Sequence, residues 1–353
     1  MEEQKNIPNN LDLVALPGFC VRGGHILYAN QAARALLLSP GQEIISLLQT
    51  GSEEYQQFQN GPLYLSLNIG GQIRNAAITR TEDMDLFLLD PDSDLEDFRS
   101  MALISMELRN PLMHVISNAE QLLSQLEPGN SDAAARMNQG LMQLMRLVCN
   151  LSDAGQYKTI SRKETRDVCS FFRELFEKAE AFTSDSGLRF SWEVPHEAIY
   201  TLIDPEQIER SVWNLISNAI KFTPRGGKIH AKLTRHGRRL SLTVTDSGSG
   251  IAENIRSTLF RRYHRMPGIE DSRFGLGLGM VIVRAAAANH GGTVLVDQPE
   301  ATGTRITMTF AVEQSSETSL CSPLLYPDYS SGWDHALVEL SDCLPPKAYE
   351  KLF

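Results

Sequence analysis

Two long stretches near the middle of the chain carry an apolar side chain every three or four residues. They extend over 92–126 and 132–155, and EPGNSD (127–132) separates them. This spacing predicts two helices with one apolar face each, the first about 52 Å long. Joined by a short loop, they would form an antiparallel hairpin domain over 92–157. One hairpin cannot bury both faces, so we expect two copies to pair as a four-helix bundle in a homodimer.

Length and composition narrow the class of protein. The chain has 353 residues, 42% of them hydrophobic and 22% charged, as expected for two or three globular domains. Its net charge of −10 disfavours nucleic acid or anionic lipid as a partner. No apolar run approaches the roughly 18–20 residues of a membrane span, and the polar start MEEQKNIPNN does not resemble a signal peptide. Five scattered cysteines without a CxxC pair suit reduced thiols, so we expect a cytoplasmic protein.

Residues 11–90 are expected to form a small α+β domain. The predicted elements are strands GFCV (18–21) and HILYAN (25–30), a helix QAARALLL, a hairpin over 64–79 and a strand DLFLLD (85–90). Their order resembles a PAS-type sensor domain, including the YAN before the first helix; a generic five-stranded module is the alternative. No cluster of His, Cys or aromatic residues there indicates a haem, a flavin or a metal.

Residues 165–312 are expected to form an α/β domain, followed by a tail over 313–353. Helices are predicted at 168–183, from Asp204 and at 278–290, and strands at 188–193, 227–234, 239–245, 292–297 and 304–312. The tail is rich in Ser, Pro and Asp to about 332. It then becomes apolar again in HALVELSDCL, so it could end in a docking helix.

The first motif of the α/β domain, WNLISNAIKFTPRGG, indicates a phosphate and metal site. Asn214 and Asn218 lie four residues apart and share one helical face. Neutral oxygens at this spacing suit a hydrated Mg²⁺ that bridges phosphates. Lys221 is one turn further on and could reach a phosphate, and Phe222 offers an apolar ring to a base.

The second motif, DSGSG, indicates recognition of a base. Asp246 ends an alternating strand, where its carboxylate can accept the exocyclic N–H of adenine and repel the carbonyl that guanine carries there. Gly248 and Gly250 would let the backbone approach the base. Thr304 starts the last strand near the same pocket.

Two further motifs indicate phosphate contacts. LFRRYHR (259–265) supplies Arg262 and Arg265 from a segment that reads as a mobile lid. In the last motif, amides at the start of a helix could bind an anion; its glycines are Gly275, Gly277 and Gly279. Each motif alone is weak, but all four in this order are a strong signal.

This order of motifs resembles the N, G1, F and G2 boxes of histidine kinases, a branch of the GHKL ATP-binding fold. The resemblance covers roughly 92–312 and implies a dimerisation hairpin and a GHKL α/β sandwich. Together with the PAS-like domain over 11–90, the chain is expected to be a multidomain α+β protein. It implies that the two asparagines bind Mg²⁺–ATP and that Lys221 and Arg265 contact phosphates. Asp246 would bind adenine beside Phe222, and the glycines of the last motif would form a lid hinge and phosphate loop. Gyrase- and Hsp90-like branches, and anti-sigma serine kinases, fit less well because they lack the hairpin.

The chain departs from this family at the phosphoacceptor. The family carries His-Glu-x-x-Thr/Asn-Pro on its first helix, whereas residues 106–111 read Met-Glu-Leu-Arg-Asn-Pro. Glu107 and Asn110 match, but the thioether of Met106 has no ring nitrogen to phosphorylate. The nearest alternative acceptor, His114, would lie about 12 Å along the helix and about 80° around it.

Two classes of function remain open. One is an enzyme of the two-component type, either an autokinase with another acceptor such as His114 or a phosphatase. A phosphatase would use Glu107 as a base and Asn110 to position water, with the receiver domain of a response regulator as its partner. The other is a pseudokinase, a non-catalytic ATP-binding scaffold. We expect an ATP-binding, histidine-kinase-like signalling protein that does not autophosphorylate at residue 106.

Overall fold

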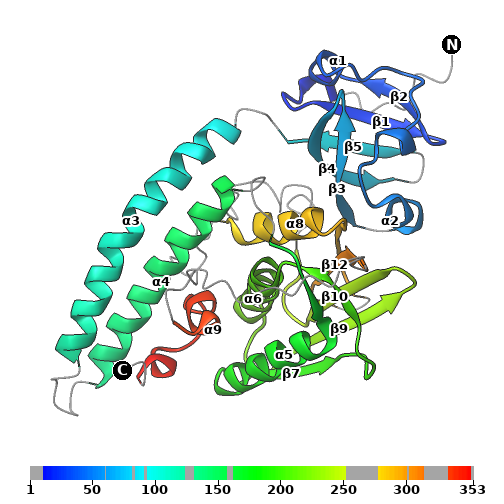
Figure 1. Cartoon of the computed structure of the whole chain (residues 1–353). Coiled ribbons are helices and arrows are strands. Elements are labelled where there is room, and N and C mark those ends of the chain that lie inside the picture. Colours follow the sequence, from blue (N-terminus) through cyan, green and yellow to red (C-terminus); the bar gives the residue numbers. More distant parts are fainter. Residues whose placement is uncertain are drawn as a thin grey trace.

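One continuous sheet contains strands from both the N-terminal part and the C-terminal half of the chain. The computed structural model describes residues 11–59, 61–81, 84–90, 94–123, 131–156, 162–251, 277–299, 302–313 and 333–350. Ten strands lie in the order β2-β1-β5-β4-β3-β11-β12-β10-β9-β7. The first five belong to an N-terminal module and the last five to a C-terminal α/β domain, and two long helices run beside them (Figure 1). The fold is therefore mixed α and β.

The N-terminal module is an antiparallel sheet with two short helices. Its elements are β1 (Gly18–Arg22), β2 (His25–Ala29), α1 (Gln31–Ala35), α2 (Ser52–Gln57), β3 (Pro62–Ile69), β4 (Gln72–Arg80) and β5 (Asp85–Leu89). The predicted hairpin is present, and its turn residues Gly70 and Gly71 have φ of 58° and 83°, which favour glycine. Helix α2 was not predicted. A separate hydrophobic core, in which Phe19 stacks on Phe87 at 4.6 Å between ring centroids, holds the module together.

Helices α3 (Asp94–Leu123) and α4 (Ser131–Gln156) form the expected helical hairpin (Figure 1). Helix α3 lies within the predicted range 92–126, whose outermost residues are outside the described ones. It contains Pro111, which cannot donate a backbone hydrogen bond. Buried residues between the helices include Ile116 and Ala119 of α3 and Leu141 and Met145 of α4. Among the helices that the structure describes, none combines the length and the hydrophobicity needed to cross a bilayer.

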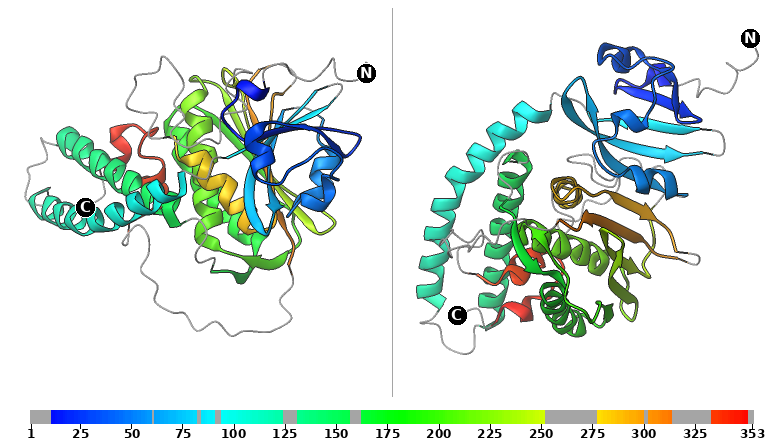
Figure 2. Two further views of the ribbon diagram at one scale, coloured as in Figure 1. Left: turned by 90° about the horizontal axis from the view of Figure 1, so that it is seen from above. Right: turned by 45° about the vertical axis from the view of Figure 1, so that its right-hand side comes forward.

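The α/β domain packs three helices on one face of its part of the sheet (Figure 2). Its elements are α5 (Val168–Asp185), β7 (Arg189–Glu193), α6 (Pro205–Phe222), β9 (Lys228–His236), β10 (Arg239–Asp246), α8 (Gly279–Asn289), β11 (Val294–Asp297) and β12 (Arg305–Ala311). Strand β7 is parallel to β9, and β10 is antiparallel to both its neighbours. A second sheet pairs β6 (Glu164–Asp167) with β8 (Tyr200–Ile203), and sequence patterns did not predict these two short strands.

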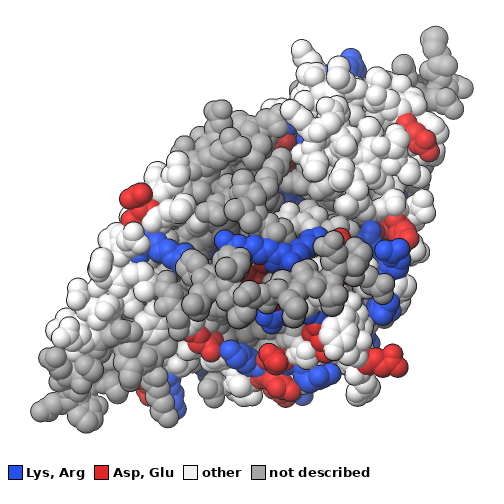
Figure 3. Space-filling view, viewed as in Figure 1, with Lys and Arg blue, Asp and Glu red and all other residues white. Residues whose placement is uncertain are grey.

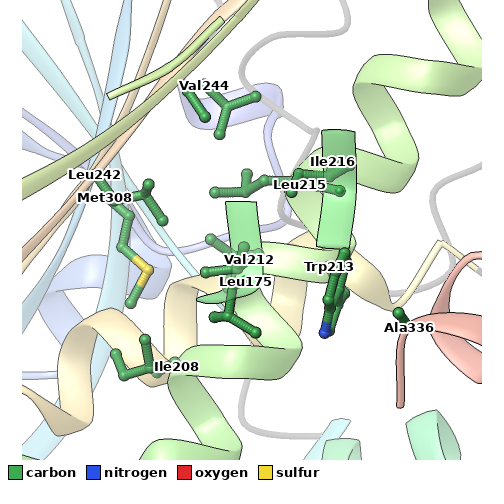
Figure 4. Close-up of a cluster of buried hydrophobic side chains, with 14 of the residues drawn as sticks. Leu175, Ile208, Val212, Trp213, Leu215, Ile216, Leu242, Val244, Met308 and Ala336 are labelled. Atoms are coloured by element: carbon green, nitrogen blue, oxygen red, sulfur yellow. The ribbon is translucent and has the colours of Figure 1, made fainter. Parts of the chain in front are cut away.

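Helix α6 is central to this domain because both ends and one whole face are fixed. The Asp204 carboxylate caps its start by accepting the Gln207 amide at 3.2 Å. Val212 and Ile216 point from α6 toward Leu242 and Val244 of β10 (Figure 4). Burying each such side chain stabilises the fold by about 1.5–3 kcal/mol. The polar residues of the helix are thereby held at set positions along the opposite face.

The N-terminal module joins the α/β domain through backbone pairing and ion pairs. In β3 and β11, Tyr64 pairs with Val294, and Leu63 with Leu295. Glu54 of α2 lies 3.3 Å from Arg239. Sequence patterns predicted two separate units here and gave no sign of this junction.

A C-terminal segment docks on the opposite side of the domain. It contains α9 (His335–Glu339) and a 3₁₀ turn over Pro346–Tyr349. Both lie against α4, and α9 also contacts α6 (Figure 1). The docking helix expected in the tail is thus a single short turn of helix, extended by irregular backbone.

Gly61 offers a test of the junction between the module and the domain. Its φ is 79°, and a side chain there would clash with the Val296 carbonyl of β11. Gly71 has a similar φ of 83°, with open space around it. We expect Gly61→Ala to lower the free energy of unfolding by about 1–3 kcal/mol more than Gly71→Ala, because only the first adds a steric clash to the backbone strain.

Chemical denaturation of both variants measures this difference. Hydrogen exchange of the amides in β3 and β11 should also accelerate in Gly61→Ala alone. Equal destabilisation by the two variants, with unchanged exchange, would contradict the β3–β11 pairing.

Candidate functional site

The side chains of the first motif face the start of α8. Helices α6 and α8 pack closely, and His290 fixes their relative position because its Nε2 accepts the Asp204 amide at 2.9 Å. His290 Nδ1 donates to the Ala286 carbonyl at 2.7 Å, and burial lowers the pKa of this imidazole, which suits a neutral, structural histidine. The start of α8 consequently lies against the polar face of α6.

Asn214 is buried and engaged by the protein through both ends of its amide. Its Nδ2 donates to the Arg210 carbonyl at 2.8 Å, and its Oδ1 accepts from Arg146 Nη2 at 3.3 Å. A side chain at Gly279 would clash with the same oxygen, so glycine is required at the first residue of α8. In this arrangement Asn214 positions α8, and its oxygen would reach a metal only after Arg146 moved away.

Asn218 and Lys221 occupy more accessible positions on the same face of α6. Asn218 donates to Met280 Sδ at 3.1 Å, and no described residue donates to its side-chain oxygen. The Lys221 ammonium lies 3.1 Å from the Asp342 carboxylate. Burial and the neighbouring Arg146 lower the pKa of Lys221, whereas Asp342 acts to raise it. Asn218 is therefore the better placed of the two asparagines to ligate a cation.

Asp246 lies at the end of β10 in a buried turn. Strand β10 alternates buried and partly exposed side chains, which directs Asp246 to the same side as Leu242 and Val244. Its Oδ1 accepts the Gly248 amide at 2.8 Å and the Thr304 amide at 3.3 Å. The predicted residues Asp246, Gly248 and Thr304 are thus brought together.

Burial sets the protonation behaviour of this carboxylate. Asp246 is 8% exposed, and desolvation raises its pKa. Hydrogen bonds from Gly248 and Thr304 act in the opposite direction but do not cancel the shift. Keeping this carboxylate ionised at neutral pH therefore costs folding free energy. The hydrogen bonds from the Gly248 and Thr304 amides fix its position in the turn.

Glycines allow the backbone to pass closely around this turn. A side chain at Gly248 would clash with the Phe222 carbonyl at the end of α6, and one at Gly303 would clash with the Asp246 carbonyl. Gly250 has a φ of 75° and lies beside Gly303. Phe222 is half-buried next to this turn. The base-side candidates consequently form one compact group at the ends of α6 and β10.

The phosphate-side candidates are described in part. Gly277 has a φ of 72°, and Gly279 begins α8 with no side chain capping the helix. Amides at a helix start can bind an anion. Arg262, Arg265 and Gly275 lie outside the described residues.

Sequence reasoning missed four charged residues that surround the first motif. Arg146 of α4 and Arg210 of α6 are 5% and 2% exposed. They contact the carboxylates of Glu339 and Asp342 in the C-terminal segment. A signal was present for two of them, because Arg146 interrupts the apolar pattern of its helix and Glu339 lies within the apolar run HALVEL.

The residues around the missing phosphoacceptor lie on the far side of the hairpin. Met106 is 52% exposed, and Glu107, Asn110 and His114 are exposed as well. Helix α4 lies between α3 and the α/β domain (Figure 1). The candidate residues on α3 are therefore separated from the candidate nucleotide-binding residues of the α/β domain within one chain.

One face of the molecule is locally basic. Lys and Arg side chains gather across the middle of one face, although the net charge is −10 (Figure 3). No group of three or more His, Cys, Asp or Glu that could hold a metal occurs among the described residues. A cation would need the amide oxygen of Asn218 together with oxygens of its own ligand.

The residues present fit a nucleotide with a divalent cation. The buried Asp246 carboxylate, in a turn where Gly248 leaves no room for a Cβ atom, suits a flat base. The Asn218 side-chain oxygen on α6 and the start of α8 at Gly279 would serve the phosphates and the cation. Residues 203–314 match the family described as histidine kinase-, DNA gyrase B- and HSP90-like ATPase.

Curated relatives extend this match beyond the domain. The chain is 31% identical over 216 residues to the sensor histidine kinase TmoS of Ectopseudomonas mendocina, covering 58% of this chain and 22% of TmoS. It is 28% identical over 224 residues to the hybrid signal transduction histidine kinase D of Dictyostelium discoideum, covering 59% of this chain and 14% of that protein. The chain thus spans less than a quarter of the length of these two relatives.

A crystal structure of full-length ShkA in complex with AMPPNP shares the fold. It has a TM-score of 0.50 and 23% identity, over 61% of this chain and 46% of ShkA. The fold and the site define an ATP-binding domain of the GHKL type. Residues 203–314 carry this domain, and the chain is similar to a sensor histidine kinase over 58% of its length.

Asp246→Asn should separate ligand binding from folding. The substitution replaces the acceptor for a base amino group with an amide, so we expect the affinity for Mg²⁺–AMPPNP to fall about 10- to 100-fold. The pKa of Asp246 is raised, so removing its charge should leave the unfolding temperature at pH 7 equal or higher. As the pH falls, protonation of Asp246 should weaken nucleotide binding to the wild type. Because the pKa of Asp246 is raised, this loss should begin at a higher pH than for an ordinary aspartate.

Calorimetric titration and thermal unfolding measure both effects. Asp12→Asn, at an exposed position of the N-terminal module, is the control and should change neither. Full affinity in Asp246→Asn would exclude this carboxylate from base recognition.

Proposed function

We propose that this chain is an Mg²⁺–ATP-binding, histidine-kinase-like signalling protein that does not autophosphorylate at residue 106. The observation that carries the proposal is the coexistence of two features. Asp246, Gly248 and Thr304 form a compact buried turn that suits a base, and Met106 stands where the resemblance expects a phosphoacceptor histidine.

Each side chain has a defined task in this proposal. Asp246 accepts the amino group of adenine, and Phe222 packs beside the ring. Asn218 ligates Mg²⁺, with Asn214 available once Arg146 has moved away. Lys221 and the start of α8, with Gly277 and Gly279, bind phosphates. Outside the described residues, we assign Arg262 and Arg265 to the phosphates and Gly275 to the lid hinge. The bound nucleotide would supply an electrophilic γ-phosphate.

The exposed apolar side chains of the hairpin support a homodimer. Leu108, Val115 and Leu122 of α3 recur every seven residues and are 48%, 54% and 64% exposed. Met137 and Leu144 of α4 repeat at the same spacing and are also exposed. A seven-residue repeat suits a second helical hairpin. We assign α3 and α4 to dimerisation through a four-helix bundle.

The remaining assignments follow the family. We propose that the N-terminal module is a PAS-like sensor domain, that the chain acts in the cytoplasm, and that its partner is the receiver domain of a response regulator. An active kinase that uses another acceptor such as His114, and a non-catalytic scaffold, are the alternatives that labelling distinguishes.

A response-regulator phosphatase is favoured by one further observation. Glu107 and Asn110 are exposed three residues apart on α3, so a docked receiver domain could reach both side chains. Asn110 could position a water molecule against an acyl phosphate, with Glu107 as the base. This chemistry does not need a histidine.

Restoring the acceptor tests the kinase half of the proposal. With γ-labelled ATP, we expect no acid-labile label on the wild type. We expect such label on Met106→His, because the new imidazole is exposed and adjoins Glu107. Met106→Gln, of similar size and without a nucleophilic nitrogen, is the matched control. Acid-labile label on the wild type that disappears in His114→Ala would overturn the pseudokinase alternative and establish an active kinase that uses His114.

Asn110→Ala tests the phosphatase activity. With a phosphorylated response regulator, the variant should slow dephosphorylation by about 10²- to 10⁴-fold, the usual contribution of positioned acid–base catalysis. Helical content measured by circular dichroism is the control for folding. A rate equal to that of the wild type would remove this activity from the proposal.

A further inference from the structure

The C-terminal segment, residues 333–350, places two carboxylates on the cations beside the first motif. Glu339 lies 3.0 Å from Arg210 and 3.2 Å from Arg146. Asp342 lies 2.8 Å from Arg146 and 3.1 Å from Lys221. The segment thus contacts the lysine that the proposed function assigns to the phosphates.

Polar side chains of α4 recognise the backbone of this segment. Gln139 Nε2 donates to the carbonyls of Ser341 at 2.9 Å and Leu344 at 2.8 Å. Gln143 donates to the same Ser341 carbonyl at 3.1 Å, and Asn138 to the Tyr349 carbonyl at 3.1 Å. Carbonyls in the turns of the segment are therefore paired with specific side-chain amides of α4.

Apolar contacts complete the docking site. Trp213 of α6 extends toward Ala336 (Figure 4), and Ala336 and Leu340 are fully buried. The Tyr349 hydroxyl donates to the Leu337 carbonyl at 2.9 Å, which closes the segment on itself. Specific polar contacts together with a buried apolar face indicate a built site for this segment.

The two carboxylates of the segment differ in how deeply they are buried. Glu339 is fully buried between two arginines, whereas the Asp342 side chain is 15% exposed and lies at the edge of the cluster. Without Asp342, Arg146 and Lys221 would lie close together with no described carboxylate between them. Arg146 would keep Glu339, but Lys221 would need another anion, and a triphosphate would satisfy both cations as well as the Asp342 carboxylate does.

We propose that residues 333–350 compete with the nucleotide within the chain, the Asp342 carboxylate holding Arg146 and Lys221 where a phosphate would otherwise bind. This inference rests on the proposed function, because the displaced ligand is Mg²⁺–ATP. By linkage, nucleotide binding loosens the segment by the same factor. Arg146 then exchanges its Asp342 partner for a phosphate, and α4 loses its amide contacts to the segment. The state of the ATP site is thereby transmitted to the helical hairpin.

Calorimetric titration of Mg²⁺–AMPPNP into the full chain tests the competition. If the segment is docked about 90% of the time, Asp342→Asn should lower the apparent Kd about tenfold, because affinity is reduced by the fraction of competent protein. Glu350→Gln removes one charge from an exposed position of the same segment and should leave the Kd unchanged.

Hydrogen exchange of the wild type provides a second readout that needs no variant. Saturating Mg²⁺–AMPPNP should accelerate exchange of the amides in residues 333–350. Equal affinities of the wild type and Asp342→Asn, together with unchanged exchange, would overturn the competition and leave the ATP site intact. Absence of binding to both folded proteins would overturn the proposed function and this inference with it.

Discussion

A buried cluster of charges holds three distant parts of the chain in register. Arg146 comes from the helical hairpin, Arg210 and Lys221 from α6, and Glu339 and Asp342 from the C-terminal segment. Removing one partner of such a buried pair typically costs about 3–5 kcal/mol, because the other charge remains in a medium that solvates it poorly. The arrangement of the hairpin, the ATP-binding domain and the C-terminal segment depends on this cluster.

The N-terminal module reaches the same helices from the other side. Asp90 follows β5 and lies 2.6 Å from Arg284 of α8, whose side chain is 5% exposed. Helix α8 begins against Asn214, and α3 starts four residues after Asp90. A change in the module could therefore reach α8 through Arg284 and through the β3–β11 pairing. Contacts from the N-terminal module and from the C-terminal segment thus reach the neighbouring helices α8 and α6.

The sequence predicted features that depend on local spacing. Asn214 and Asn218 share a face of α6 because helical geometry requires it, and Asp246 is buried at the end of β10 because the strand alternates. The pattern over residues 64–79 predicted a hairpin because two glycines mark its turn, and strands β3 and β4 pair there.

Features that depend on long-range contacts were not predictable in this way. The pairing of β3 with β11 uses backbone groups that every sequence possesses. Arg146 and Glu339 are 193 residues apart, and neither side chain carries information about its partner. Strands β6 and β8 are only four residues long, too short for a period to emerge.

A crystal structure of the full chain with Mg²⁺ and AMPPNP would test the central claim most directly. The account predicts the adenine amino group on Asp246, the cation on Asn218, phosphates on Lys221, and Asp342 displaced from that lysine. A nucleotide bound elsewhere, or crystals that stay free of nucleotide at saturating concentration with Asp246 unchanged, would contradict it.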